Sequence, residues 1–186
     1  MKIYIKNMVC DRCIMAVKSE FKQMGIHPVA IELGHVELLE DWNDEDKVVL
    51  NKRLVELGFE LLVDKANTTI ERIKNQIVAL VHHRNLDLKT NLSSYLAENL
   101  AQDYNILSNL FSDYEGTTIE NFFIKQKIEK VKELLSYNEL SLSEIAFKMN
   151  YSDVAHLSNQ FKKTTGMTPT NFKKTVEIKR TQIDSL

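Results

Sequence analysis

This 186-residue chain has few of the residues that build tethers, disulfides and membrane spans. It contains only five Gly and two Pro, so no stretch has the composition of a flexible linker between domains. No apolar run reaches the length of a membrane span, and the first residues become polar too soon for a signal peptide. We therefore expect a cytoplasmic protein with no membrane partner.

Cysteine is also scarce, since it occurs only at Cys10 and Cys13. In a reducing compartment, two cysteines so close together are typical of metal or thiol-redox chemistry and not of a structural disulfide. The chain has no Gly-rich phosphate loop, no nucleophile elbow and no metalloprotease motif. The sequence therefore predicts a protein that is not an enzyme and that carries no organic cofactor.

The net charge is close to zero, at −2, but its sign changes along the chain. Residues 1–65 hold nine basic against twelve acidic residues and residues 66–120 hold four against seven, which gives −3 in each. Residues 121–186 hold eleven Lys and Arg against seven Asp and Glu, a net charge of +4. Because nucleic acid attracts positive charge, only this last third has the sign that a DNA-binding surface needs.

The first 65 residues alternate between strand patterns and helix patterns. Apolar residues alternate in the strands and recur at helical spacing in the helices, in the order βαββαβ. The predicted elements are a strand at Lys2–Lys6, a helix that includes Ile14, Val17, Phe21 and Met24, strands at Pro28–Leu33 and His35–Leu39 joined at Gly34, a helix at Glu45–Leu57 and a strand at Phe59–Val63. This order predicts an α+β chain that begins with a ferredoxin-like domain over residues 1–65.

A loop with the pattern Met8-x-Cys10-x-x-Cys13 joins the first strand to the first helix. Together with Gly58-Phe59 before the last strand, this loop resembles that of the heavy-metal-associated domains of copper chaperones and metal-transporting ATPases. It departs from that family at Asn7-Met8-Val9, where Gly-Met-Thr is usual. The resemblance implies a soft metal ion held by Cys10 and Cys13.

Two thiols at the start of a helix suit such an ion for physical reasons. The helix amides and dipole, with Arg12 beside the sulfurs, favour the thiolate forms. Two soft sulfurs fit a near-linear Cu(I) ion, whereas Zn(II) would need further ligands, for which Met8, His27 and His35 are the candidates. We expect Cu(I) or another soft metal ion. The alternatives are a thiol-redox pair, or a domain that has lost its ion and serves for dimerisation or docking.

A short polar segment, Asp64–Thr69, marks the predicted end of the first domain. Thr69 is a candidate N-cap for a helix whose apolar stripe includes Ile70, Ile73 and Ile77. We expect this linking helix over about residues 69–83, at the start of a second, all-α domain over residues 66–186. The helix could transmit a metal-induced change mechanically, although a stripe of Ile and Leu is more often core or a dimer face.

The C-terminal part contains a helix-turn-helix pattern. Ser141 followed by Glu144 is a capping box that starts a helix, and Asn150 can take the left-handed conformation of a tight turn. A second helix, capped by Ser152, would bury Leu157. Its other face carries small, amide and cationic groups that suit base edges and phosphates in a major groove: Ala155, His156, Asn159, Gln160, Lys162 and Lys163.

By composition alone, this face could equally be the solvated side of an ordinary helix pair. A longer pattern decides between the two: Ile145-Ala146, Asn150-Tyr151-Ser152-Asp153, Leu157-Ser158, Phe161-Lys162-Lys163, Gly166, Thr168-Pro169 and Phe172-Lys173. It resembles the second helix-turn-helix of the AraC/XylS family of bacterial transcription regulators, which implies sequence-specific binding to double-stranded DNA. The family usually has Gly at Asn150, an aromatic residue at Leu157 and Arg at Asn159, and the lost Arg removes a strong contact to phosphate or guanine.

Residues 92–116 repeat this pattern with a turn one residue shorter, and a long helix over about Ile119–Tyr137 joins the two copies. Their second helices could enter successive major grooves, roughly 34 Å apart. The outward positions of the first copy include no Lys or Arg: Asn105, Ile106, Ser108, Asn109 and Ser112, followed by Asp113 and Glu115. We expect the second copy to supply most of the electrostatic contact, helped by Lys125, Lys127, Lys162, Lys163, Lys173 and Lys174.

Two functions from different classes fit these patterns. The first is a one-component transcription regulator in which a metal-responsive domain is joined to an AraC-type DNA-binding domain. Its partners would be double-stranded DNA and RNA polymerase, and it would act as a monomer or a weak homodimer. The alternative is a metal carrier or thiol-redox protein whose helical domain docks other proteins. A regulator that acts only through protein contacts is a third hypothesis.

Overall fold

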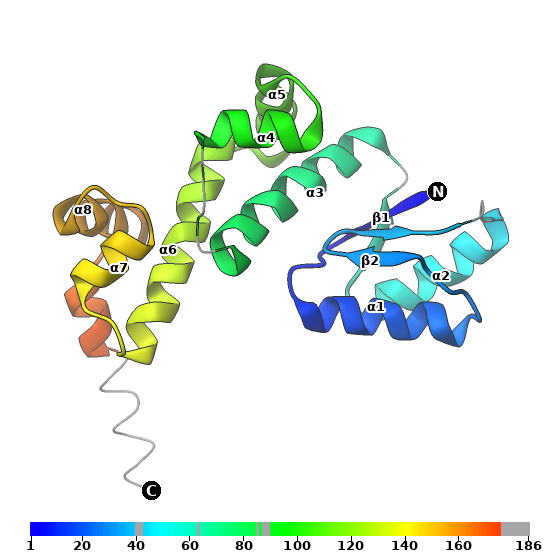
Figure 1. Ribbon diagram of the computed structural model, residues 1–186, viewed down its shortest axis with the longest axis horizontal. Helices are drawn as coiled ribbons and strands as arrows, with labels where there is room; N and C mark the ends of the chain where they lie inside the picture. Colours follow the sequence, from blue (N-terminus) through cyan, green and yellow to red (C-terminus); the bar gives the residue numbers. More distant parts are fainter. Residues whose placement is uncertain (40–42, 63, 85, 87–89, 176–186) are drawn as a thin grey trace, which may run out of the picture. The chain divides into compact units, whose positions relative to one another are not determined.

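Backbone contacts divide the chain into two compact units. The computed structural model describes residues 1–39, 43–62, 64–84, 86 and 90–175. The first unit comprises the described residues of Met1–Ala79 and Thr90–Tyr114, and the second comprises those of Leu80–Lys89 and Glu115–Leu186. Each unit buries its own set of apolar side chains, and Figure 1 shows the elements of both. The domain ranges 1–65 and 66–186 stay a prediction.

The first unit begins with four strands and two helices in the order βαββαβ (Figure 1). Their bounds are β1 Lys2–Lys6, α1 Asp11–Gln23, β2 Ala30–Glu32, β3 His35–Glu37, α2 Asp44–Glu56 and β4 Glu60–Leu62. The strands form one antiparallel sheet in the order β2-β3-β1-β4, with Ile3 opposite Val36 and Ile5 opposite Leu61. The order of elements is the predicted one, although β2 and β3 are shorter than expected. Val63, at the end of the last predicted strand, lies outside the described residues.

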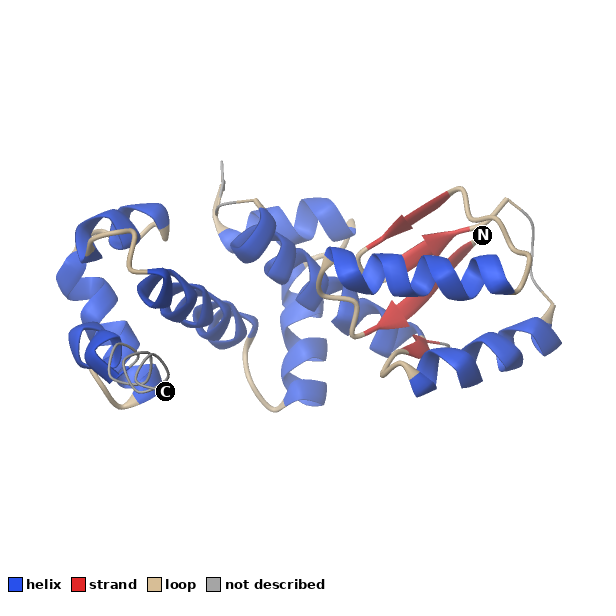
Figure 2. Cartoon of the chain, turned by 90° about the horizontal axis from the view of Figure 1, so that it is seen from below, coloured by secondary structure: helices blue, strands red, loops and turns tan. Residues whose placement is uncertain are grey.

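One face of the sheet forms a core with the first two helices. Ile5 of β1, Phe21 of α1 and Leu50 of α2 have no exposed surface and belong to one apolar cluster. Both helices therefore cover the same face of the sheet, as Figure 2 shows. Burying a side chain of this size contributes roughly 1.5–3 kcal/mol, so this cluster stabilises the domain.

The opposite face of the sheet meets α3 (Lys65–Val78). Tyr4 points away from the core because its neighbours in β1 are buried, and the Arg72 guanidinium lies 5.9 Å from the centre of the Tyr4 ring. In the turn between β2 and β3, Gly34 has a φ of +84°, and a Cβ there would overlap the side-chain amide of Asn75. Gly34 thus allows the hairpin to approach α3 closely.

The start of α3 differs from the prediction, because the helix expected over residues 69–83 begins at Lys65. Asp64 is the N-cap, and its carboxylate accepts a hydrogen bond of 3.0 Å from a backbone N–H in the first turn. Thr69, the predicted cap, lies buried inside the helix. Both residue types make good caps, but Asp64 comes first and no helix breaker separates the two. A π-helical turn, η1 (Ala79–His83), follows α3.

The remaining helices form two helix-turn-helix pairs and the long helix between them. Their bounds are α4 Leu92–Leu100 and α5 Tyr104–Glu115, then α6 Ile119–Tyr137, and then α7 Leu142–Lys148 and α8 Val154–Thr165. A helical segment over 169–175 ends the described part of the chain. The predicted long helix is confirmed at both ends, and Thr118 caps it by accepting a hydrogen bond from the backbone N–H of Asn121. In the described part of the chain, no helix has the length and apolar character that a membrane span requires.

Candidate nucleic-acid interface and cysteine pair

The second helix-turn-helix begins with the predicted capping box, which is confirmed. The Ser141 hydroxyl accepts a hydrogen bond of 3.3 Å from the backbone N–H of Glu144, whose carboxylate accepts one of 2.8 Å from the backbone N–H of Ser141. The Ser141 hydroxyl also donates to this carboxylate at 2.7 Å, and that bond is the main reason why the pKa of Glu144 lies below its usual value. The cap therefore stays ionised at neutral pH and fixes the start of α7.

The turn between α7 and α8 depends on two polar residues. Asn150 has a φ of 52°, the left-handed conformation expected for it. The N-cap of α8 is Asp153 and not Ser152 as predicted, since the Asp153 carboxylate accepts a hydrogen bond of 2.7 Å from the backbone N–H of His156. The Ser152 hydroxyl lies instead 3.1 Å from Nδ1 of His156. Adjacent Ser and Asp are both competent caps, and here the helix starts after the second of them.

The two faces of α8 differ sharply. Leu157 and Phe161 have no exposed surface and anchor the helix in the second unit. Five of the six residues predicted to contact DNA are exposed: Ala155, His156, Asn159, Lys162 and Lys163. At 100° per residue, all five project within one continuous sector of the helix, opposite the buried pair. The structure thus brings them together on one solvent-facing surface, which we call the α8 face.

Gln160, the sixth predicted residue, lies at the edge of this surface and is half-buried. Its side-chain oxygen accepts a hydrogen bond of 2.7 Å from the hydroxyl of the buried Tyr151. The same Tyr151 ring meets the His156 ring edge to face, with the ring centres 5.2 Å apart. Because its oxygen already accepts one hydrogen bond, Gln160 has less acceptor capacity left for a base than the exposed Asn159.

A groove of about 340 Å³ runs beside the α8 face, between the start of α6 and α8. Lys125 and Lys163 line it, together with the polar side chains of Thr117, Asn121 and Thr164. The backbone N–H groups at the N-terminus of α6 add partial positive charge nearby. The sequence prediction placed the start of this helix correctly but did not include Thr117 and Asn121 among the candidate contact residues.

The first helix-turn-helix presents a different surface. Its predicted contact residues are exposed or half-exposed on α5: Asn105, Ser108, Asn109 and Ser112. In register with α8, Asp113 takes the place of Lys163, and exposed Ile106 takes the place of His156. We call this surface of α5, formed by Asn105, Ser108, Asn109 and Ser112, the α5 face. It has no positively charged side chain and would attract phosphate less than the α8 face.

The prediction that Lys127 helps to bind DNA is wrong, because this side chain is only 8% exposed. Its ammonium lies 3.8 Å from the centre of the Tyr151 ring and 5.7 Å from that of Phe123. Burial lowers the pKa of Lys127 to about 8 and raises that of Tyr151 to about 12. Lys127 therefore belongs to the core of the second unit and cannot reach a phosphate.

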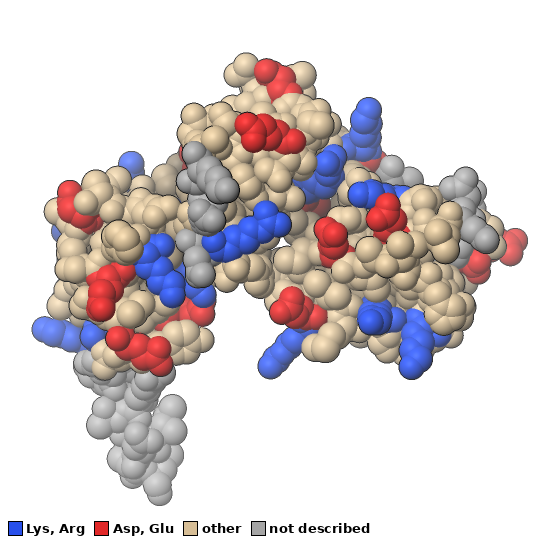
Figure 3. All heavy atoms as spheres, viewed as in Figure 1, with Lys and Arg blue, Asp and Glu red and all other residues tan. Residues whose placement is uncertain are grey.

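The charges of both units are mixed. On the face seen in Figure 3, basic and acidic groups of the described residues alternate and leave no large area of one sign. Lys125, Lys162, Lys163 and Lys174 are exposed, and Lys173 is half-buried. Because the chain as a whole carries −2, any attraction to DNA would depend on local cations such as those beside the α8 face.

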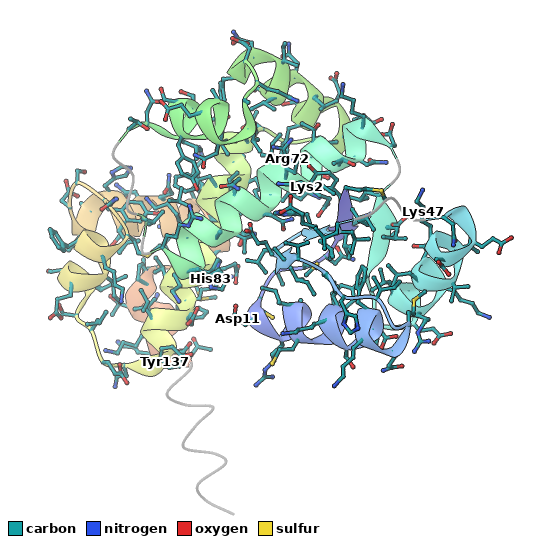
Figure 4. All side chains as sticks on the ribbon, turned by 45° about the vertical axis from the view of Figure 1, so that its right-hand side comes forward. Lys2, Asp11, Lys47, Arg72, His83 and Tyr137 are labelled. Carbon is teal, nitrogen blue, oxygen red and sulfur yellow. The ribbon has the colours of Figure 1, made fainter. Side chains whose placement is uncertain are left out.

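The second candidate site is the cysteine pair at the start of α1, where Figure 4 labels the neighbouring Asp11. The two sulfur atoms lie 3.5 Å apart, and both side chains are partly exposed. The pKa of Cys10 lies below its usual value, mainly through the backbone N–H and then the thiol of Cys13, with a smaller effect of the Arg12 charge. Cys10 thus has the properties of a nucleophilic or metal-binding thiol.

The histidines considered as further zinc ligands do not join these sulfurs in a metal-binding group within the described part of the chain. Met8 is fully buried in the core of the sheet domain, and His35 lies on β3 beside Tyr4, with the two ring centres 6.0 Å apart. Among the described residues, no group of three or more His, Cys, Asp or Glu side chains is placed to hold a metal ion. The chemistry of the site is therefore that of two sulfurs, which suits a two-coordinate soft ion better than Zn(II).

Comparison with known proteins finds similarity to transcription regulators, and a family model matches only the C-terminal part. Residues 96–175 match the model of a helix-turn-helix domain. The uncharacterized HTH-type transcriptional regulator YtdP of Bacillus subtilis is 24% identical over 193 residues, covering 88% of this chain and 25% of its own length. The C-terminal domain of AraT, a response regulator from Geobacillus stearothermophilus, is 27% identical with a TM-score of 0.51, covering 60% of this chain and 88% of that one.

A third relative shows likeness of fold alone. The DNA-binding domain of AdpA, a global transcriptional factor solved in complex with a target DNA, is 18% identical with a TM-score of 0.50, and the match covers 59% of this chain and 96% of that chain. The chain spans only a quarter of the length of its curated relative YtdP. The helix-turn-helix domain is therefore shown, whereas the part played by the first 65 residues has to be argued from their own chemistry.

Proposed function

From a helix-turn-helix domain over residues 96–175, we propose that this protein is a sequence-specific, DNA-binding transcription regulator of the AraC type. The observation that carries the proposal is the α8 face, where five polar or small side chains project together from a helix anchored by Leu157 and Phe161. A helix of this kind fits the major groove. Of the proteins with similar folds, AraT is a response regulator and AdpA is a global transcriptional factor.

Each residue of the α8 face has a role in this proposal. Asn159 can pair with adenine through both polar groups, and the Ala155 methyl can contact a thymine methyl. His156 can reach guanine or a phosphate. Lys162 and Lys163 lie nearer the C-terminal end of α8, where they can contact the backbone of the DNA. Gln160 has a smaller role in base contact, because its oxygen is held by Tyr151.

The α5 face is proposed as the weaker reader. It offers hydrogen-bond donors to bases or phosphates from Asn105, Ser108, Asn109 and Ser112. The nearby Asp113 carboxylate, however, would repel the DNA phosphates. RNA polymerase as a partner, and a monomeric or weakly dimeric state, belong to the same proposal.

For the N-terminal domain, we propose a ferredoxin-like fold that responds to a soft metal ion through Cys10 and Cys13. The strand order and the two helices on one face support the fold. With metal–sulfur bonds of about 2.3 Å, two sulfurs on opposite sides of one ion are about 4.6 Å apart. The observed 3.5 Å is shorter, but rotation about the side-chain bonds of these partly exposed residues can open the pair. A thiol-redox role is the alternative that the same distance supports.

The DNA proposal is tested by selecting bound sequences from a random pool with the full chain and with His156→Ala/Asn159→Ala. We expect a defined motif for the unmodified chain and loss of preference in the variant, with a cost of about 1–3 kcal/mol for each lost base contact. Asn67→Ala, which removes an exposed amide from α3, is the matched control. An unchanged motif in the double variant would refute the assignment of α8 as the reading helix.

The metal proposal is tested separately, by titrating Cu(I), with Zn(II) as comparison, into the reduced chain and into Cys10→Ser/Cys13→Ser. Stoichiometric Cu(I) binding that needs both cysteines and changes the affinity for the selected DNA would support a metal-responsive regulator. A selected motif that is insensitive to metal would remove the metal part and leave the regulator. Metal binding without a selected motif would favour the carrier.

A further inference from the structure

A polar cavity of about 200 Å³ lies in the first unit, where α3 crosses the outer face of the sheet. Its lining comes from β1, the β2–β3 hairpin, α3 and α4 and includes Lys2, Tyr4, His35, Arg72, Asn75 and Gln76. Lys2 and Arg72, labelled in Figure 4, approach it from β1 and from α3. The cavity is separate from the cysteine pair and contains no residue of the proposed DNA-binding faces.

Asn75 is the first sign of a ligand. Its side chain is only 8% exposed and lines the cavity, yet among the residues that the structure describes, none is hydrogen-bonded to its amide. A buried amide without partners is unfavourable, and native proteins rarely keep one without a reason. A bound molecule with polar atoms in the cavity would give the Asn75 amide its missing hydrogen bonds.

The charges in the cavity indicate the chemistry of that molecule. Neither Lys2 nor Arg72 forms an ion pair with another described residue, and the flat guanidinium of Arg72 lies over the Tyr4 ring. The one carboxylate of the lining, Glu32, is 69% exposed and lies 3.8 Å from Nε2 of His35. Two unpaired cations therefore face a cavity whose acidic group is at the solvent side, which favours an anion.

Two further groups are held in fixed positions by Tyr95 of α4. The Tyr95 hydroxyl donates to the side-chain oxygen of Gln76 at 3.0 Å, which leaves the Gln76 amide nitrogen as a donor. The Asn99 amide nitrogen donates to the backbone oxygen of Tyr95 at 2.7 Å, which leaves the Asn99 side-chain oxygen as an acceptor. The cavity thus offers donors for an anionic group and one acceptor for a hydroxyl or amine.

We propose that this cavity binds a small molecule with a carboxylate or phosphate group. Arg72 and Lys2 bind its oxygen atoms, the Asn75 and Gln76 amides donate to them, and Asn99 accepts from a hydroxyl or amine of the ligand. A volume of about 200 Å³ is below that of drug-sized sites, so the ligand has few heavy atoms. Because α4 belongs to the first helix-turn-helix, such a ligand would tie the outer face of the sheet to that pair.

Calorimetric titration of the full chain with inorganic phosphate and with succinate tests the proposal. We expect saturable binding of at least one probe, with affinity at least tenfold lower in Arg72→Gln. Lys22→Gln, which removes an exposed charge from α1, is the matched control and should bind as the unmodified chain does. Absence of saturable binding to the unmodified chain, or equal weakening in both variants, would overturn the proposal.

Asn75→Leu separates a binding role from a structural one. If the amide serves a ligand, this variant should lose probe binding while its melting temperature without probe stays equal or rises, since an unpartnered polar group has been removed. A lower melting temperature together with unchanged probe binding would show that Asn75 is structural and would contradict the proposal. Neither readout depends on DNA or metal binding, so failure here leaves the proposed function untouched.

Discussion

The side-chain amide of Asn150 donates a hydrogen bond of 2.9 Å to the carbonyl oxygen of Leu86, 64 residues earlier in the chain. Asn150 is also the left-handed residue of the turn between α7 and α8, with a φ of 52°. Leu86 is 2% exposed, so its carbonyl oxygen has little access to water. One residue therefore shapes the turn before α8 and connects that turn to a distant segment of the second unit. A Gly at this position could serve only the first role.

Substitutions of Asn150 separate its two roles. Asn150→Gly keeps the left-handed turn but loses the bond to Leu86, and we expect it to lower the free energy of unfolding by about 1 kcal/mol. Asn150→Ala loses the bond and also strains the backbone, so it should cost about 1–2 kcal/mol more. Urea denaturation followed by circular dichroism measures both. If Gly and Ala cost the same, the turn conformation contributes nothing measurable.

Ala101 occupies the equivalent position after α4, with a φ of 53°, and has no polar side chain to offset the strain. We expect Ala101→Gly to raise the free energy of unfolding by about 0.5–1 kcal/mol, because relief of the strain outweighs the greater entropy of an unfolded glycine. The same denaturation experiment serves here, with Ala97→Gly inside α4 as the control. The control should be destabilised, and a destabilised Ala101→Gly would refute the argument.

Local patterns carried much of the prediction from sequence. The capping box at Ser141 and the long helix Ile119–Tyr137 were predicted as they are found, because both depend on neighbouring residues. Where two residues within five positions of each other could both cap one helix, the predicted cap was wrong: Ser152 instead of Asp153, and Thr69 instead of Asp64. Such choices depend on small differences that tertiary packing decides.

Features that need two distant segments were not predicted. Lys127 was taken for a surface lysine, although it stands four residues before Val131 on the apolar stripe of α6, a signal that could have shown its burial. The ring over which its ammonium lies belongs to Tyr151, which follows α7 in the chain, and no local sequence pattern reveals that contact. The cavity around Asn75 also exists only because α3 lies against the sheet.

Burial of Lys127 should make stability depend on pH. Its pKa is about 8 when folded and about 10.4 in an unfolded chain, so between these values the unfolded chain binds more protons. The free energy of unfolding should therefore rise as pH rises from about 8 toward 10, while burial of the charged form weakens the fold below pH 8. We expect Lys127→Met to be more stable at pH 7 and to lack this rise. Urea denaturation at pH 7, 8.5 and 9.5 measures it.

Lys125→Met is the control for this experiment, since Lys125 is exposed on the same helix. It should keep the pH dependence of the unmodified chain. A rise that persists in Lys127→Met would have to come from other groups. Tyr151 is not among them, because its pKa is about 12 when folded and about 10 in an unfolded chain, so its titration would lower the free energy of unfolding as pH rises.

A change of charge beside the α5 face should strengthen its binding to DNA. Asp113→Lys places a cation where α8 has Lys163, so we expect roughly 1 kcal/mol tighter binding, about fivefold, to the selected DNA. The slope of log affinity against log salt should steepen by about 1 if the new Lys contacts a phosphate. Glu56→Lys makes the same change of charge on α2 and should alter neither value strongly. Equal effects of the two variants would mean that α5 does not lie against DNA.

The lowered pKa of Cys10 predicts unequal reactivity of the two thiols. Cys10 has a larger thiolate fraction near neutral pH, so iodoacetamide should modify it before Cys13, as peptide mass spectrometry over a time course would show. Cys13→Ala removes the thiol that lies 3.5 Å from the Cys10 sulfur but keeps the backbone N–H, so it should slow the labelling of Cys10 only in part. Cys10→Ala should leave the slow labelling of Cys13 unchanged. Faster modification of Cys13 in the unmodified chain would contradict the prediction that Cys10 is the more reactive thiol.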